Sequence, residues 1–384
     1  MRRTLIPLSL LALLVSSSSA ADWLHLPAKA GTANGKKIVL VSGDEEYRTE
    51  ESCPMLAKIL SQRHGFDCTV LFAINPDGGY IDNNYQKNIP GTEALDSADL
   101  MIIGTRFRQL PDEQLANFAE FLNAGKPVIG IRTATHAFAG EAKTGEFKWK
   151  DFGLNILGER WVNHHGGHGR DGTLGVVEPA NAGHPMLRGV GEVFGPTDVY
   201  GIANLDQKSA TILLRGAVTE SLDPKSKPVA GKKNDPMMPL AWLREYTAPN
   251  GAKKGQALCT TLGASVDFAD EDLRRLTVNT AFHLLGMKVP DKADVTFVDP
   301  FEPTFFKGLG GDFYKKRNLK PDDYMPGKSP ATGGGEVSPA KAPEAKTGGM
   351  NSAPANASHA QMPVPGPATE KRPQAVAPDR KSVV

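Results

Sequence analysis

The fold is decided by the stretch Pro127-Val128-Ile129-Gly130-Ile131-Arg132-Thr133-Ala134-Thr135-His136-Ala137-Phe138. Its apolar half, residues 128–131, is short and follows Gly125-Lys126-Pro127, as in a buried parallel strand. The run stops at Arg132, and small and hydroxyl-bearing residues follow. We therefore predict a strand that turns into a helix here. Because open α/β sheets bind ligands at the carboxyl ends of their strands, this corner is expected to carry the functional site.

Strands alternate with helices on the amino-terminal side of this corner. Buried apolar runs predict strands at residues 36–43, 67–72 and 99–105, and helical spacing predicts helices around residues 53–60 and 115–122. Such alternation implies right-handed crossovers and a doubly wound parallel sheet. With a 2-1-3-4 strand order, residues 44–48, 106–108 and 132–136 meet in one crevice. Residues 75–95 have no periodicity and are predicted to form a long loop.

Short strands dominate after Gly140. A short helix at residues 149–157 is followed by predicted strands at residues 173–177, around Val199 and Leu213, at 240–246 and at 256–261. Asp270 is expected to cap a last helix that ends at Gly286. The predicted fold class is thus a doubly wound α/β sheet with an additional β-rich excursion.

The two ends of the 384-residue chain differ in composition from its middle. Residues 1–21 have a basic start, an apolar run and small residues, which predicts a signal peptide and export to the periplasm or the cell exterior, without a membrane span. Residues 326–384 lack Phe, Tyr, Trp, Leu and Ile, which predicts a disordered Pro/Ala/Lys-rich tail. The α/β domain is expected at residues 36–290, followed by an extension at 291–325.

Composition also limits partners and cross-links. Lys plus Arg (44) nearly equals Asp plus Glu (43), so the chain has no electrostatic footprint for nucleic acid. Three cysteines are an odd number for an oxidising compartment. Cys53 and Cys68 either form a disulfide or pack separately in the core, because each falls in an apolar pattern.

The residues after the first strand, Asp44-Glu45-Glu46-Tyr47-Arg48, have the chemistry of a polyol clamp. Carboxylates accept hydrogen bonds from hydroxyls, a tyrosine stacks on the face of a sugar ring, and an arginine donates paired hydrogen bonds from its guanidinium. Arg106, Thr133 and Thr135 end neighbouring strands and are candidates for binding the same substrate. The alternative is a solvated loop with an internal pair between a glutamate and the arginine.

Five of the nine histidines lie between His136 and His184. His136, His164 and His165 are candidate general acid/base groups. Together with His168, the pair His164-His165 also forms a candidate site for zinc or another divalent ion. Hydrogen bonds to a sugar and plain loop histidines stay open as alternatives. No G-x-G-x-x-G opens the first helix, so no nucleotide cofactor is evident.

Arg132 is the remaining catalytic candidate. Its guanidinium is either an anchor for a carboxylate or keto oxygen of a substrate, or the partner of Asp44 or Glu46 in a buried pair.

Several motifs together resemble the ThuA-like (trehalose utilisation) family of the class I glutamine amidotransferase-like superfamily. They are I-V-L-V-S-G at residues 38–43, G-I-R-T-A-T-H-A-F at 130–138, H-P-M-L-R-G-V at 184–190, P-L-A-W-L-R-E-Y at 239–246, T-T-L-G at 260–263 and L-R-R-L-T-V-N at 273–279. The resemblance implies a flavodoxin-like sheet and an association with disaccharides such as trehalose and their keto derivatives. It also likens residues 130–134 to the amidotransferase nucleophile elbow, whose central cysteine is replaced here by Arg132.

A guanidinium cannot act as the nucleophile, so glutamine amidotransfer is not expected. We expect a small-molecule carbohydrate as the partner and a hydrolase or isomerase that uses histidines as acid/base groups. The alternatives are a non-catalytic carbohydrate-binding or cell-envelope interaction protein, and a metal-dependent hydrolase.

Overall fold

The computed structural model describes residues 22–310 and 312–330, which form an α/β fold around one mixed sheet. In spatial order its ten strands are β1 (Trp23–Leu26), β3 (Asp67–Leu71), β2 (Lys37–Gly43), β6 (Leu100–Thr105), β7 (Val128–Ile131), β14 (Lys254–Thr260), β13 (Met238–Thr247), β12 (Thr211–Val218), β10 (Thr173–Val177) and β11 (Val193–Gly195). The predicted α/β sheet with a β-rich addition is confirmed. The predicted signal peptide and residues 331–384 of the predicted tail lie outside the described residues.

The parallel half of the sheet has the expected 2-1-3-4 order in β3, β2, β6 and β7. A fifth parallel strand, β14, pairs with β7, so that Cys259 lies opposite Gly130. The chain reaches β14 through the antiparallel pair β13–β14, whose turn contains Gly251 at φ 74°. This return makes β7 a central strand, and its carboxyl end is therefore enclosed by neighbours on both sides.

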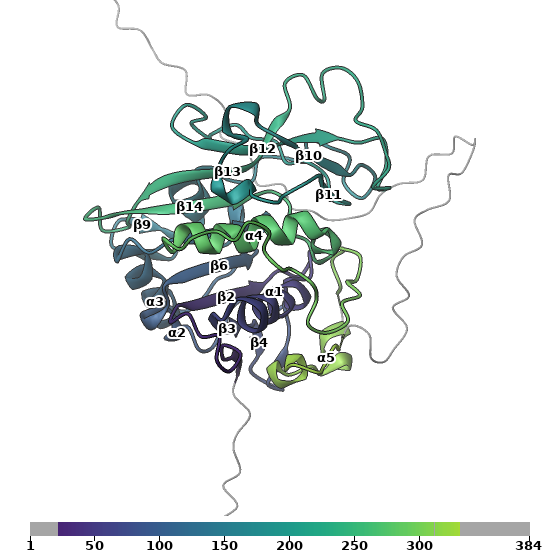
Figure 1. Cartoon of the computed structure of the whole chain (residues 1–384). Helices are drawn as coiled ribbons and strands as arrows, with labels where there is room; N and C mark the ends of the chain where they lie inside the picture. Colours follow the sequence, from purple (N-terminus) through teal and green to yellow (C-terminus); the bar gives the residue numbers. More distant parts are fainter. Residues whose placement is uncertain (1–21, 311, 331–384) are drawn as a thin grey trace, which may run out of the picture. The chain divides into compact units, whose positions relative to one another are not determined.

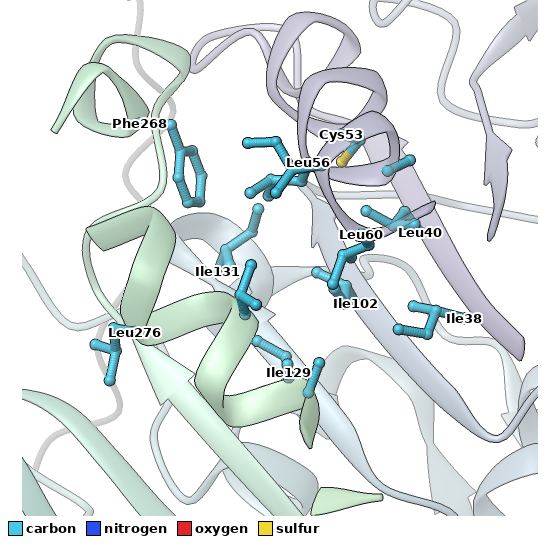
Figure 2. Packing of buried hydrophobic residues seen from close by; sticks show 14 of the residues in the cluster. Ile38, Leu40, Cys53, Leu56, Leu60, Ile102, Ile129, Ile131, Phe268 and Leu276 are labelled. Atoms are coloured by element: carbon cyan, nitrogen blue, oxygen red, sulfur yellow. The ribbon is translucent and has the colours of Figure 1, made fainter. Parts of the chain in front are cut away.

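Helices cover both faces of the parallel half (Figure 1). On one face, α1 (Thr49–His64) and α4 (Glu271–Leu284) pack on alternate strand residues, and Figure 2 shows Leu56 and Leu276 on either side of Ile129 and Ile131. On the other face lie α2 (Ala94–Ser97) and α3 (Asp112–Asn123). The predicted helix ends are confirmed where Gly65 closes α1 in a left-handed conformation and where Asp270 caps α4 by accepting from the Leu273 N–H.

Three details differ from the sequence-based expectation. The predicted loop 75–95 includes the first two residues of α2 and the hairpin strand β5 (Tyr80–Ile81), which pairs with β4 (Ile74–Asn75). The predicted helix 149–157 is split into a short 3-10 turn, Trp149–Asp151, and a π turn, Gly153–Leu157. Val199 lies in a loop, because the segment around it pairs with the histidine-rich loop through a single bridge between His164 and Tyr200.

The segment after α4 packs back onto the domain and includes α5 (Phe313–Arg317). Phe306, Tyr314 and Tyr324 are buried, and Lys58 of α1 binds Asp299 at 2.5 Å. Cys53, Cys68 and Cys259 are buried free thiols, and burial raises the pKa of the Cys53 thiol. No helix within residues 22–310 and 312–330 has the length and apolar character needed to cross a bilayer.

Candidate functional site

Backbone strain marks the carboxyl edge of the parallel strands. Arg48 follows β2, Phe107 follows β6 and Arg132 follows β7, and their φ angles are 65°, 51° and 40°. Left-handed conformations in non-glycine residues cost roughly 1–3 kcal/mol and persist where the surrounding structure enforces them, often at functional sites. The strain therefore points to the edge that the sequence predicts as the site.

Arg132 begins the short 3-10 turn Arg132–His136 and is 1 % exposed. Its guanidinium lies between the rings of Tyr47 and Tyr200, at 4.1 and 4.4 Å from their centroids. It donates hydrogen bonds to five oxygens: Thr197 Oγ1 (3.1 Å), Thr261 O (2.8 Å), Tyr47 Oη (3.2 Å), Asp198 O (3.2 Å) and Asp198 Oδ1 (3.2 Å). The ion-pair partner is thus Asp198, and the expected pairing with Asp44 or Glu46 is wrong.

Two histidines converge on the same buried carboxylate. His164 Nδ1 lies 2.7 Å from Asp198 Oδ2, and His168 Nδ1 lies 3.1 Å from Asp198 Oδ1. The two imidazole centroids are 4.4 Å apart, and the side chains are 32 % and 38 % exposed, so both rings reach solvent while Asp198 does not. Gly166 permits this approach, because a Cβ atom there would lie only 3.0 Å from the Asp198 Cβ.

The charges of this cluster stabilise one another. Hydrogen bonds from His164 and His168, with the charge of Arg132, outweigh burial and hold the pKa of Asp198 well below its usual value. The hydrogen bonds to Asp198 and to Glu46 raise the pKa of His168 to about 9, so this imidazole is cationic at neutral pH.

Glu46 and Arg106 extend the network toward β6. Glu46 Oε1 lies 3.2 Å from His168 Nε2, and Glu46 Oε2 lies 3.0 Å from Arg106 Nη2. Burial opposes ionisation, but His168 and Arg106 together lower the pKa of Glu46 to about 2. Arg106 also binds Glu45, whose other oxygen lies 3.0 Å from Arg108 Nη2. The glutamates of the predicted clamp are therefore paired with arginines in this structure.

His136 lies on the other side of this network and is surrounded by aromatic rings. The centroids of Phe107, Trp161 and Tyr200 are 4.9, 5.8 and 6.4 Å from its own. Burial, followed by the positive charge of Arg106, holds the pKa of His136 well below its usual value, so the ring is neutral at pH 7. Trp161 is 38 % exposed and lies 5.6 Å from the His164 ring, so it connects the two histidines at the surface.

Four predicted site residues have other partners. Asp44 is buried, where it accepts from the Thr133 hydroxyl at 2.5 Å and from two backbone N–H groups, and burial raises its pKa to about 6. Arg48 binds Glu50 at 2.7 Å and lies over the ring of Phe313, away from the cluster.

The other two are histidine and threonine side chains. His165 Nε2 lies 2.7 Å from the carbonyl of Lys233, so the structure does not bring His165 to the cluster. The Thr135 hydroxyl lies 3.1 Å from His136 Nδ1 and is buried, so it orients this ring.

Asp198 is the functional candidate that sequence reasoning missed. It lies 34 positions beyond His164, in a loop without periodicity, and no spacing rule links the two. The available signal was an acidic residue between Thr197 and Val199, two positions before the aromatic Tyr200.

This fold and site define a flavodoxin-like α/β protein whose strand-to-helix corner carries a buried arginine. A family model described as ThuA, trehalose utilisation, matches residues 37–283, and the chain belongs to this family.

Similar solved structures include two proteins described as ThuA-like. One, from Parabacteroides merdae, is 16 % identical over 66 % of this chain and 92 % of its own, with a TM-score of 0.46. Another, from Bacteroides uniformis, is 16 % identical over 70 % of this chain and 98 % of its own, with a TM-score of 0.43. No curated protein matches the chain.

Proposed function

We propose that the chain binds a carbohydrate at the carboxyl edge of its parallel strands and processes it with histidine acid/base groups. The observation that carries this proposal is the exposed Trp161, whose ring lies 5.8 Å from His136 and 5.6 Å from His164. An exposed aromatic ring offers a flat apolar face and suits the apolar face of a sugar. Membership in a family described as trehalose utilisation supports the same ligand class.

The two histidines suit different steps of proton transfer. Burial holds the pKa of His136 well below its usual value, so the ring is in its neutral, unprotonated form at pH 7, the form that a general base requires. Asp198 fixes the orientation of His164 through Nδ1, as the carboxylate does in an Asp–His pair. His164 Nε2 has no hydrogen-bond partner within the described part of the chain. These roles fit hydrolysis or isomerisation of a disaccharide or keto-disaccharide.

Arg132 acts in this proposal as a positioning residue. Its guanidinium is covered by two tyrosine rings and holds Asp198, which in turn orients His164. We also propose that the chain is exported, on the composition of residues 1–21; fractionation of the native host, with blotting of periplasm and cytoplasm, tests this.

The test combines calorimetry and product analysis with a panel of disaccharides and their keto derivatives. Trp161→Ala should weaken binding, whereas His136→Ala and His164→Ala should each lower turnover by about two to four orders of magnitude. His165→Ala is the matched control, because His165 lies in the same loop and binds Lys233. Saturable binding without product after long incubation would favour the alternative, a non-catalytic carbohydrate-binding protein. If no sugar of the panel binds, the proposal is wrong.

A further inference from the structure

We propose that His164, His168 and Asp198 bind a divalent transition-metal ion beside Trp161. One possible ligand atom from each residue lies within 4.8 Å of the other two. Imidazole nitrogens and a carboxylate oxygen form the ligand set of many zinc sites. The sequence predicted His164, His165 and His168 as ligands, whereas in this site the carboxylate of Asp198 takes the place of His165.

The distances between the histidine nitrogens and the Asp198 oxygens are those of hydrogen bonds. A metal ion can take the place of the protons between these atoms. The Nδ1 atoms lie 2.7 and 3.1 Å from the two Asp198 oxygens, as in hydrogen bonds. Ligands of a tetrahedral zinc ion lie about 3.4 Å apart, as follows from metal–ligand distances near 2.1 Å. Since His164 and His168 are partly exposed and their loop contains Gly166, Gly167 and Gly169, a small outward shift of the rings suffices.

The surroundings match those of a metal site. A ligating histidine usually donates its other ring N–H to a carboxylate, and His168 Nε2 lies 3.2 Å from Glu46 Oε1. A ligating carboxylate is usually held by a further donor, and Arg132 Nη2 lies 3.2 Å from Asp198 Oδ1. Asp198 and Glu46 offset the charge of the ion, whereas Arg132 opposes it.

Three protein ligands leave a coordination position for a water molecule or a substrate oxygen. Next to Trp161, a hydroxyl or keto oxygen of a sugar would suit that position. With the ion bound, His164 is a metal ligand and no longer the proton-transfer group described under the proposed function. Proton transfer then falls to His136 alone, because His136 lies outside the ligand set. This assignment of a role rests on the proposed function, but the binding of the metal does not.

The test is metal analysis of the untagged full-length protein, without any sugar. After chelation and reconstitution with zinc, inductively coupled plasma mass spectrometry should find about one ion per chain. Cobalt should give visible absorption bands typical of nitrogen and oxygen ligands. Asp198→Asn and His168→Ala should lose the ion, His165→Ala should keep it, and Glu46→Gln should bind zinc about 10–100-fold more weakly.

Circular dichroism checks that each variant is folded. A second measurement needs no variant: the melting temperature of the wild-type protein is followed as the zinc concentration increases. A melting temperature that rises with zinc concentration supports the proposal. Substoichiometric zinc in the wild-type protein, or equal uptake by Asp198→Asn and His165→Ala, overturns it. Zinc binding without sugar binding would instead contradict the proposed function alone.

Discussion

Arg132 holds together three loops through side-chain and backbone oxygens. It binds Tyr47 after β2, Thr197 and Asp198 in the loop after β11, and Thr261 after β14. Both terminal nitrogens of its guanidinium donate hydrogen bonds, and the rings of Tyr47 and Tyr200 lie 4.1 and 4.4 Å from it, whereas Nε has no hydrogen-bond partner among the described residues. Its expected contribution is therefore to stability and to the placement of Asp198.

Replacing Arg132 with Met should lower the free energy of unfolding by about 3–5 kcal/mol, because Asp198 then loses its buried cationic partner. Urea denaturation followed by circular dichroism measures the change. Arg170→Ala is the matched control; that side chain is 79 % exposed and should change stability by less than about 0.5 kcal/mol. Equal stability of both variants would contradict the assigned role.

Asp44 should give the protein a distinct dependence on pH. Burial raises its pKa from 3.8 to about 6, so between these values the folded protein keeps a proton that the unfolded chain has released. This group therefore disfavours folding increasingly as pH rises from about 4 to 6. Asn cannot ionise, so the stability of Asp44→Asn relative to wild type should improve by about 2–3 kcal/mol between pH 4 and pH 7. Stability curves that stay parallel over this range would refute the shift.

Residues 302–309 form a strap that completes the site. They lie beyond residues 37–283, which the family model matches. The Phe306 ring is stacked on Tyr47 at 5.2 Å and lies 5.2 Å from His168. Backbone and side-chain contacts fix its path, since Lys307 N donates to Glu46 O and Thr304 N donates to Glu51 Oε2. The strap thus packs on Tyr47, which contacts Arg132, and on His168.

Phe306→Ala should destabilise the protein by about 3–5 kcal/mol and also weaken sugar binding, because Tyr47 and His168 lose a packing partner. Phe306→Leu should restore most of the affinity. Phe297→Ala is the control, since Phe297 packs on the core beneath α1 and α4 and should lower stability only. Calorimetry and urea denaturation separate the two effects, and an unchanged affinity in folded Phe306→Ala would contradict this role.

The elements that were predictable are those with periodic patterns. Strands β2, β6 and β7 are continuous apolar runs, and α1 and α3 have regular stripes, so local sequence defines them. The order of these strands predicted which edge of the sheet carries the site. The contacts within the site were not predictable, because Asp198 and Phe306 come from irregular segments whose positions depend on tertiary packing. The same cause misplaced Val199 and the contacts of His165.

The whole described chain depends on the segment beyond the family match. Residues after 283 contribute buried Val295, Phe306, Tyr314 and Tyr324, and Arg48 lies over the rings of Phe313 and Tyr314. The extension also satisfies Glu51, which accepts two hydrogen bonds from Thr304. The part of the fold that the family model matches is thus incomplete as a unit in this protein.

A chain that stops after Pro290 should melt roughly 10 °C or more below the full-length protein, because it exposes these apolar contacts and removes the aromatic rings beside Arg48 and the Thr304 donors of Glu51. A chain that stops after Pro330 keeps every described residue and should melt with the full-length protein. Scanning calorimetry compares the three. Equal melting of the shorter chain would show that the extension is dispensable.

The strap has a consequence for the order in which the protein matures. Tyr47 and Phe306, which stack in the finished site, are separated by about 260 positions of chain. At a ribosomal speed of about 5–20 residues per second, roughly 13–52 s pass between their synthesis. The histidines and Asp198 are synthesised within this interval, when the ring that supports them is still unmade. A polypeptide released before residue 306 would therefore lack the aromatic contact with Tyr47 and His168.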